Sequence, residues 1–230
     1  MKKSKACEKL FCSPGNAGIQ KIAECKFINL KKKVQILNFC NKNSIDLVII
    51  GPEEYLADGL SDYLQNKGIQ TFGPVKKAAK LETSKSFAKS FLLKNKILTP
   101  KYRKFTAINK ALDYLNSVNF PIVIKADGLA AGKGVVICKN FNEAEQTIKL
   151  IMEKKKFGDA GKTIIIEEFI DGFEISYFSF FDKKNFLPLG YALDHKRAFD
   201  NDLGPNTGGM GCFTPSKKVS KNLEKKIIKN

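Results

Sequence analysis

The stretch that decides the fold is residues 122–137, which read IVIKADGLAAGKGVVI. Three β-branched residues lead into a lysine, and a loop of small residues separates them from a second β-branched run. The loop holds a G-K pair like that of a phosphate-binding loop, but no Ser or Thr follows Lys133, and VVI stands where that motif begins a helix. The stretch therefore predicts a hairpin whose loop lets backbone approach a phosphate, with an ordinary wide-turned hairpin as the alternative.

The composition is that of a globular protein. The chain has 230 residues, 43% of them hydrophobic, which is enough for one or two domains with buried cores. No apolar run approaches the ~20 residues of a membrane span, and the N-terminus lacks the apolar stretch of a secretory signal. The cysteines show neither a CxxC pair nor a metal-binding spacing, so we expect reduced thiols in a cytoplasmic protein.

The net charge of +17 suggests a nucleic-acid partner, because basic surfaces neutralise phosphates and release counterions. Nearly all of this charge is lysine, however, and it is spread through every segment. Arg103 and Arg197 are the only arginines, whereas proteins that read bases rely on the bidentate arginine fork. We therefore expect neither a nucleic-acid partner nor a membrane partner, and assign the excess lysine to solvated surfaces.

The first 80 residues alternate strand and helix patterns. Strands are expected over 9–13, 46–50 and 69–72, and helices over 34–42 and 55–67. Strands that are joined by helices predict a parallel sheet with helices on its faces.

Each of these strands runs into a turn that contains glycine: PGNAG at 14–18, GPE at 51–53 and GP at 73–74. Ligands of parallel sheets bind at the carboxyl ends of the strands, where these turns would lie. The turns are therefore candidate binding loops, and the alternative for each of them is a simple tight turn.

The rest of the chain combines helices with the hairpin and two further strands. Helices are expected over 76–95, 108–117 and 142–154, and strands over 162–170 and 174–182. Polar and glycine-rich loops follow, at 194–197 and 204–211.

The strand after the hairpin carries a second candidate site, in IIIEEFIDGFEIS at residues 164–176. An apolar strand that runs into Glu167 and Glu168 and then into Phe-Ile offers backbone groups for the edge of an adenine ring and apolar side chains for its faces. Glu174 is placed to accept hydrogen bonds from ribose hydroxyls, and an inward-facing Lys125 would supply charge for phosphates. The alternative for the glutamates is a solvated strand end.

The motifs together resemble those of the phosphoribosylamine–glycine ligases, the glycinamide ribonucleotide synthetases of purine biosynthesis within the ATP-grasp enzymes. In chain order they are PGNAG, GPE, LETSK, PIVIKADGLAAGKGV, IIEEFIDG, DHKR and GPNTGGMG. The hairpin lysine and the acidic hinge are shared among ATP-grasp enzymes, whereas DHKR with GPNTGGMG is specific to this ligase. The resemblance implies an α/β fold with a truncated Rossmann-like parallel-sheet domain over 1–80. An incomplete ATP-grasp domain over 81–230, with an α+β lid at about 114–177, is implied to follow.

The resemblance also implies a reaction. ATP phosphorylates the carboxylate of glycine, and the amine of 5-phosphoribosylamine attacks the glycyl phosphate to give glycinamide ribonucleotide, ADP and phosphate. A carboxylate is a poor electrophile until one oxygen becomes a leaving group, so catalysis depends on positioning and charge neutralisation. The implied partners are these small molecules, and the implied cofactors are ATP with Mg²⁺ or Mn²⁺.

Carried over residue by residue, the resemblance implies two groups of site residues. Those for ATP are Lys85, Lys125, Asp127, Gly128, Gly132, Lys133, Gly134, Glu167, Glu168, Phe169, Ile170 and Glu174. Those for glycine and phosphoribosylamine are Gly15, Asn16, Gly51, Pro52, Glu53, Asp194, Lys196, Arg197, Pro205, Asn206 and Thr207. Lys125 and Arg197 are the candidate catalytic residues. His195 is expected to be structural, because attack of an amine on an acyl phosphate needs little basic help.

Two departures from the family pattern lead us to expect a fragment. The first strand with its GGREH-type loop is missing at the start, and the metal-holding glutamate and asparagine with the RFGDPE-type motif are missing after KKIIKN. We therefore expect no metal ligand within this chain, and no turnover by it alone unless a complementing chain supplies the rest. The alternatives are a non-catalytic ATP-binding remnant and another ATP-grasp carboxylate–amine ligase.

Overall fold

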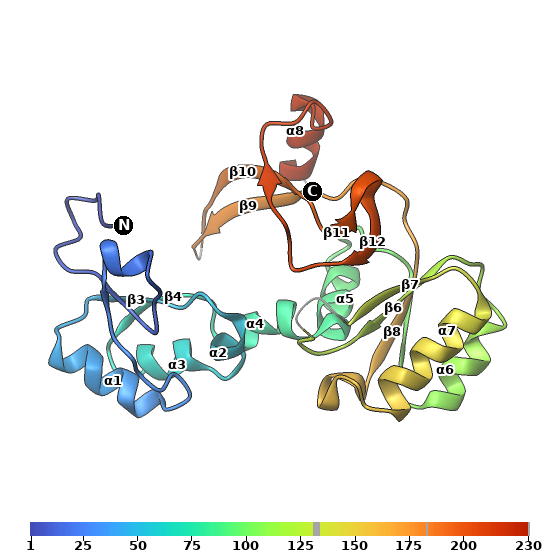
Figure 1. Ribbon diagram of the computed structural model, residues 1–230, viewed down its shortest axis with the longest axis horizontal. Helices are drawn as coiled ribbons and strands as arrows, with labels where there is room; N and C mark the ends of the chain where they lie inside the picture. Colours follow the sequence, from blue (N-terminus) through green and yellow to red (C-terminus); the bar gives the residue numbers. More distant parts are fainter. Residues whose placement is uncertain (131–133, 183, 230) are drawn as a thin grey trace. The chain divides into compact units, whose positions relative to one another are not determined.

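The computed structural model describes residues 1–130, 134–182 and 184–229. The chain divides into two compact units, Met1–Thr83 and Ser84–Asn230, and each is described by itself (Figure 1). Within the described ranges, no helix has the length and apolar character that crossing a membrane requires.

The first unit is built from short parallel strand pairs and helices. Strand β1 pairs with β2, and β3 pairs with β4, in both cases in parallel. Its elements in chain order are β1 (Phe11–Cys12), η1 (Ile19–Lys21), β2 (Glu24–Cys25), α1 (Lys33–Lys42), β3 (Leu47–Ile49), α2 (Glu53–Ala57), α3 (Leu60–Gln65), β4 (Gln70–Phe72) and α4 (Lys76–Thr83). The parallel pairing expected for this part of the chain is confirmed.

Helices and strand ends enclose one apolar core in the first unit. It consists of Ile36, Cys40, Ile50, Leu56, Leu60, Leu64 and Ala79. Leu64 of α3 is fully buried. A helix of six residues is too short to be stable by itself, so α3 depends on this tertiary packing.

Two helices expected to be continuous are each divided in two. The single helix over 55–67 is wrong, because Gly59 adopts a left-handed conformation with φ of 81° between α2 and α3. The single helix over 76–95 is also wrong, because Ser84 is extended, with φ of −139° and ψ of 108°, between α4 and α5 (Lys85–Lys94). The Ser84 side chain caps α5 by accepting the backbone N–H of Phe87 at 3.2 Å. The cap satisfies a donor that continuous helix would have bonded internally, so the break costs little.

The second unit contains a four-stranded antiparallel sheet in the order β5-β8-β6-β7. The strands are β5 (Tyr102–Phe105), β6 (Ile122–Ala126), β7 (Val135–Cys138) and β8 (Ile164–Glu168). The hairpin expected from residues 122–137 is confirmed as the β6–β7 pair, in which Lys125 lies opposite Val135. Strand β5 was not expected, and it pairs with β8 rather than with a neighbour in sequence.

Helices α6 (Ile108–Leu115) and α7 (Phe141–Ile148) pack on one face of this sheet, as Figure 1 shows, together with a π-helical turn at Lys149–Glu153. Side chains alternate between the two faces of a strand, so every second residue of β6 and β8 points toward these helices. The resulting core contains Ala111, Leu115, Ile122, Ile124, Ala126, Cys138, Ala144, Ile148, Ile151, Ile164 and Ile166. The alternate residues, among them Lys125 and Glu167, point to the other face.

The end of the second unit forms a separate antiparallel sheet in the order β13-β10-β9. Its strands are β9 (Ser176–Phe181), β10 (Phe186–Asp194) and β13 (Cys212–Phe213). A strand pair, β11 (Arg197–Phe199) with β12 (Leu203–Asn206), lies between β10 and β13 in sequence, and α8 (Lys221–Lys229) follows. The glycine-rich region expected to be loop is therefore partly strand.

Candidate functional site

The register of the four-stranded sheet brings a lysine and a glutamate together on the face that α6 and α7 leave uncovered. Val123 and Tyr102 both lie opposite Glu167 on the strands that flank β8, and Lys125 lies opposite Ile165. Residues opposite one another share a face, and diagonal neighbours remain within reach of long side chains. Lys125 is such a diagonal neighbour of Glu167, and its ammonium pairs with Glu167 Oε1.

Glu167 is buried, and its carboxylate pairs with two lysines. Its side chain is only 3% exposed, and the second lysine, Lys89 of α5, places Nζ 2.5 Å from Glu167 Oε2. A buried carboxylate is tolerated when its charge is paired, so this arrangement accounts for an acidic residue at the end of an apolar strand. The solvated strand end considered for Glu167 is therefore wrong.

Lys89 was not among the expected site residues. Its Nζ also donates to Thr99 Oγ1 at 2.8 Å and to the carbonyl of Pro100 at 3.2 Å, and lies 5.4 Å from the centre of the Tyr102 ring. A sequence signal was present, because Lys85 and Lys89 are four residues apart and share one face of a helix. That signal does not by itself distinguish a solvated lysine from a buried one.

Asp127 ties the hairpin to the start of α5. Its carboxylate accepts the backbone N–H of Ser86 at 2.5 Å and the hydroxyls of Ser84 and Ser86 at 3.1–3.3 Å. The Lys85 ammonium donates to the carbonyl of Gly128 at 3.3 Å, and the Lys85 backbone N–H donates to the carbonyl of Asp127 at 3.0 Å. The structure thus brings Lys85, Lys125 and the start of the hairpin loop into one region. Gly132 and Lys133 lie outside the described residues.

The two glutamates at the end of β8 differ in their surroundings. Glu168 is exposed, and its Oε1 accepts the backbone N–H of Lys101 at 2.8 Å. Phe169 and Ile170 follow, with 37% and 61% of their surface exposed. Two apolar side chains of this size are thus left open just after the buried Glu167 in sequence, which is the composition expected of a seat for a flat apolar ring.

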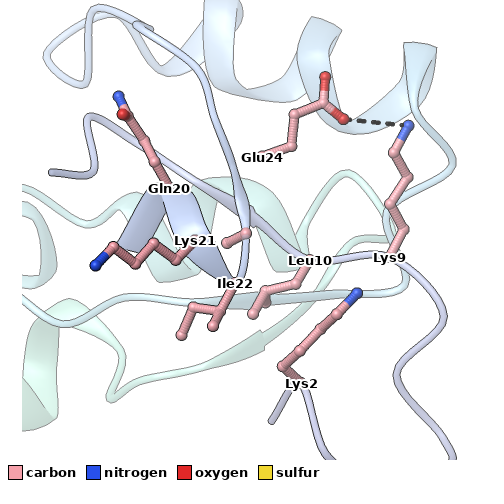
Figure 2. Close-up of a pocket in the computed structure, with 8 residues that line it drawn as sticks. Lys2, Lys9, Leu10, Gln20, Lys21, Ile22 and Glu24 are labelled. Atoms are coloured by element: carbon pink, nitrogen blue, oxygen red, sulfur yellow. Dashed lines mark ion pairs between the residues drawn. The ribbon is translucent and has the colours of Figure 1, made fainter. Parts of the chain in front are cut away.

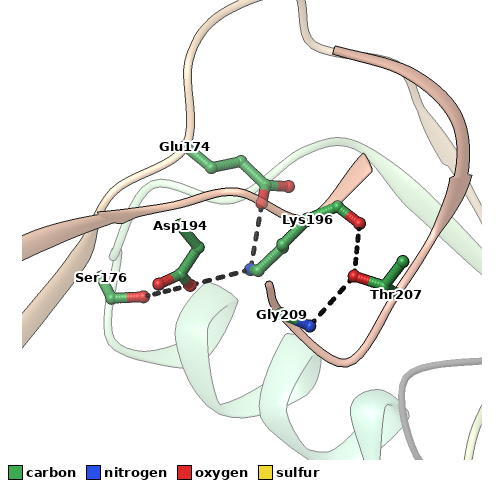
Figure 3. A network of polar contacts seen from close by, with 6 residues as sticks. All are labelled: Glu174, Ser176, Asp194, Lys196, Thr207 and Gly209. Carbon is green, nitrogen blue, oxygen red and sulfur yellow. Dashed lines mark hydrogen bonds and ion pairs between the residues drawn. The ribbon is translucent and has the colours of Figure 1, made fainter. Parts of the chain in front are cut away.

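A second polar network joins Glu174 to the residues around Lys196, and Figure 3 shows its members. Lys196 Nζ lies 3.1 Å from Glu174 Oε2 and 3.6 Å from Asp194 Oδ2. The hydrogen bond to Glu174 is the main cause that raises the pKa of Lys196 above its usual value. The hydroxyl of Ser176 donates to Asp194 at 3.3 Å.

The Lys196 backbone also organises the glycine-rich segment. Its carbonyl accepts both the N–H and the hydroxyl of Thr207, at 2.7 and 2.9 Å, and the Thr207 oxygen accepts the N–H of Gly209 at 3.1 Å (Figure 3). Arg197 donates to the carbonyl of Gly204 at 2.8 Å. Pro205 and Asn206 lie on β12. The expected residues Glu174, Asp194, Lys196 and Thr207 are therefore brought together.

His195 lies between β10 and β11. Its ring stacks on Phe213 with centroids 5.3 Å apart, and its backbone bonds to Gly211 and Met210. The structural role expected for His195 stays a prediction.

The remaining expected residues belong to the first unit. Gly15 has φ of +80°, and Cβ at this position would meet Cys25 Sγ at 2.2 Å, so only glycine fits the PGNAG turn. Asn16 Oδ1 accepts the N–H of Ile19 at 2.9 Å. Gly51 and Pro52 precede α2, which begins at Glu53.

A hollow of about 300 Å³ lies near the start of the same unit (Figure 2). It is lined by Lys2, Lys9, Leu10, Gln20, Lys21, Ile22, Ala23 and Glu24, none of which is an expected site residue. An exposed ion pair of 3.4 Å joins Lys9 to Glu24 beside it.

Within the described part of the chain, no group of three or more His, Cys, Asp or Glu side chains is close enough to hold a metal ion.

Comparison with known proteins covers the whole chain. Residues 83–230 match the family described as phosphoribosylglycinamide synthetase, ATP-grasp (A) domain, and residues 1–82 match the N domain of the same synthetase. A phosphoribosylamine–glycine ligase from Clostridium acetobutylicum is 45% identical over all of this chain and 56% of its own length. Another from Fusobacterium nucleatum is 47% identical over 97% of this chain and 52% of its own length.

A solved structure supports the same relationship. The crystal structure of phosphoribosylamine–glycine ligase from Thermotoga maritima superimposes with a TM-score of 0.77 at 32% identity, covering 96% of this chain and 53% of that one. The α/β fold with parallel strands first and an ATP-grasp domain after them is thereby confirmed. The chain spans about half the length of the curated relatives it matches.

Proposed function

Because the chain belongs to the phosphoribosylglycinamide synthetase family, we propose that it binds ATP on the sheet face that carries Lys125 and Glu167. The observation that carries this proposal is the Lys125–Glu167–Lys89 cluster on that face, beside the exposed Phe169 and Ile170. The cluster holds two ammonium groups against one carboxylate. An excess of positive charge next to an open apolar surface suits a nucleotide, which has a flat base and an anionic tail.

Each part of ATP has a counterpart in these residues. Phe169 and Ile170 offer apolar surface for the adenine ring, and Glu174 is the candidate acceptor for ribose hydroxyls. Lys125 and Lys85 supply charge for the phosphates. The hairpin loop, including Gly132 and Lys133, is proposed to contact the phosphates as well, as the family resemblance implies.

The proposed substrates are those of the family's ligase, glycine and 5-phosphoribosylamine, and the proposed compartment is the cytoplasm. Asp194, Lys196, Arg197 and Thr207 are the candidates for contact with glycine and the acyl phosphate. Pro205 and Asn206 are further candidates for contact with glycine and the acyl phosphate. The candidates for contact with phosphoribosylamine are Gly15, Asn16, Gly51, Pro52 and Glu53. Lysine and arginine side chains there would orient the carboxylate and offset the charge that develops on its oxygens.

ATP-grasp enzymes use ATP together with Mg²⁺, which supplies charge neutralisation between phosphate oxygens. The described residues of this chain contain no group of three or more His, Cys, Asp or Glu side chains that could hold a metal ion, and none of them is assigned to Mg²⁺. The proposal for this chain is nucleotide binding through its own side chains.

The test is to measure ATP and adenosine binding by calorimetry in the chain and in Lys125→Ala. Loss of an ion pair to phosphate should weaken ATP about 10- to 100-fold and leave adenosine nearly unchanged. Lys162→Ala is the matched control, because that lysine is 70% exposed and pairs with Asp159, three residues before it. Equal losses for ATP and adenosine in Lys125→Ala would contradict the assigned role.

A further inference from the structure

The two lysines on Glu167 are held very differently. Lys89 is 9% exposed and is anchored by Thr99, Pro100 and the Tyr102 ring in addition to the carboxylate. Lys125 is 26% exposed and reaches the carboxylate from the neighbouring strand. Lys89 is therefore a buried residue, and Lys125 lies at the boundary between the interior and the solvent.

The charges of the cluster do not cancel. Two ammonium groups face one carboxylate, so one positive charge is in excess. A buried ion pair that loses one partner leaves an uncompensated charge, which is strongly unfavourable. With Lys89 in place, Glu167 keeps a partner when Lys125 moves away.

We propose that Lys89 is a positioning residue for nucleotide binding, and that it acts by releasing Lys125. Lys89 holds Glu167 permanently, so that Lys125 exchanges the carboxylate for an anionic phosphate when a nucleotide arrives. Without the Lys89 charge, Lys125 would be the sole counter-ion of a buried carboxylate and would stay on it. This inference rests on the proposed ATP site and assigns Lys89 a role that requires no contact with the ligand.

The main test compares Lys89→Met with Lys89→Arg in the full chain, with ATP and adenosine as the ligands. Methionine keeps the apolar stem and removes the charge, so we expect ATP affinity to fall at least about tenfold while adenosine affinity changes less than about twofold. Arginine keeps the charge and should retain most of the ATP affinity. Parallel losses for ATP and adenosine in Lys89→Met would overturn the inference, because they would indicate a merely structural residue.

A double variant tests the mechanism by which Lys89 acts. In Lys89→Met/Glu167→Gln the carboxylate charge is also removed, so Lys125 is no longer held and ATP affinity should recover relative to Lys89→Met. Losses that simply add in the double variant would overturn the exchange of partners.

A measurement without nucleotide separates this inference from the proposed function. Acetylation of Lys125 by acetic anhydride can be followed by mass spectrometry. It should be slower in Lys89→Met, and faster in Glu167→Gln, than in the chain without substitutions. If the unmodified chain fails to bind ATP, the proposed function is wrong, and the acetylation rates still decide whether Lys89 governs Lys125. Rates that are the same in the unmodified chain and in Glu167→Gln would overturn the inference even if Lys89→Met does not fold.

Discussion

The carboxylate of Asp127 lies at the N-terminus of α5, where its Oδ1 accepts the backbone N–H of Ser86 at 2.5 Å. Asp127 directly follows strand β6, so this bond fixes the end of the hairpin strand against the first turn of the helix. A negative charge at this position also meets the positive end of the helix dipole. As a result Lys85 and Lys125, which are far apart in sequence, are held in one region.

Replacing Asp127 should destabilise the chain. Asp127→Ala removes an acceptor for the Ser86 N–H and two hydroxyls, and we expect the free energy of unfolding to fall by about 1–2 kcal/mol. Urea denaturation monitored by circular dichroism measures it. Asp159→Ala is the control, because Asp159 is 89% exposed and its removal should change little. A loss in Asp127→Ala no greater than that of the control would show that the helix start does not depend on this carboxylate.

Gly161 should not tolerate a side chain. It is buried in a 3-10 turn before β8, and a Cβ at this position would lie 2.7 Å from the carbonyl oxygen of Ile151. Backbone must move to admit it, so Gly161→Ala should lower the midpoint of urea unfolding by an amount that corresponds to about 1–3 kcal/mol. Gly51→Ala is the matched control, since among the described residues no atom outside its two chain neighbours lies within 4 Å of the added methyl group. Similar midpoints for the two variants would rule out a close contact at Gly161.

The Glu174–Lys196 pair should be visible in the titration of the lysine. The pKa of Lys196 is raised chiefly by its hydrogen bond to Glu174, so Glu174→Gln should move its titration toward lower pH. Lysine side-chain NMR measures the midpoint, and Glu145→Gln, which faces Lys149 at 2.8 Å, is a control that should leave Lys196 unchanged. An unshifted Lys196 in Glu174→Gln would show that the pair does not form in solution.

The same shift sets the sign of a pH effect on stability. The pKa of Lys196 is higher in the folded chain than in the unfolded chain, so the Glu174–Lys196 pair stabilises the fold as long as the lysine is charged. This stabilisation is fully present below the unfolded lysine pKa of about 10.4, and it is lost as pH rises through the higher folded pKa. Both partners are more than one third exposed, so the contribution is below about 1 kcal/mol. The difference in unfolding free energy between the chain and Glu174→Gln should therefore shrink above pH 10 and stay constant near neutrality.

The cysteines should differ in reactivity. Burial raises the pKa of the Cys40 and Cys138 thiols, which are 2% and 0% exposed, whereas Cys212 is exposed. A raised pKa lowers the thiolate fraction at a given pH, and burial blocks access, so a disulfide reagent at neutral pH should label Cys212 well before those two. Rapid labelling of Cys138 under native conditions would contradict the burial of this residue at the end of β7. Mass spectrometry after timed labelling distinguishes the sites.

The sequence by itself determined the elements whose signals are local. The β-branched runs and small-residue loop of residues 122–137 specified the β6–β7 hairpin, because strand propensity and turn chemistry act over a few residues. The alternation of strands, helices and glycine turns in the first unit likewise indicated the parallel pairing of β3 with β4. The motifs also identified the family, since they stand in the same order along the chain.

Other features depended on contacts between distant residues. The residues of β5 carry little strand signal of their own, and they form a strand because they pair with β8, more than fifty residues later. Gly59 and Ser84 each divide a helix whose local periodicity continues across the break, because tertiary packing and a capping bond outweigh helix propensity there.

The site shows the same division. Sequence motifs predicted that Lys125 and Glu167 lie near a nucleotide, but they gave no indication that Glu167 is buried or that Lys89 also pairs with it. The sequence does not distinguish a solvated lysine from a buried one. A lysine is tolerated in the interior only when folding brings a carboxylate to its ammonium group, and that contact joins residues far apart in sequence. That meeting of α5 with β8 is a property of the tertiary structure, and it decided which of the chain's many lysines are available to a ligand.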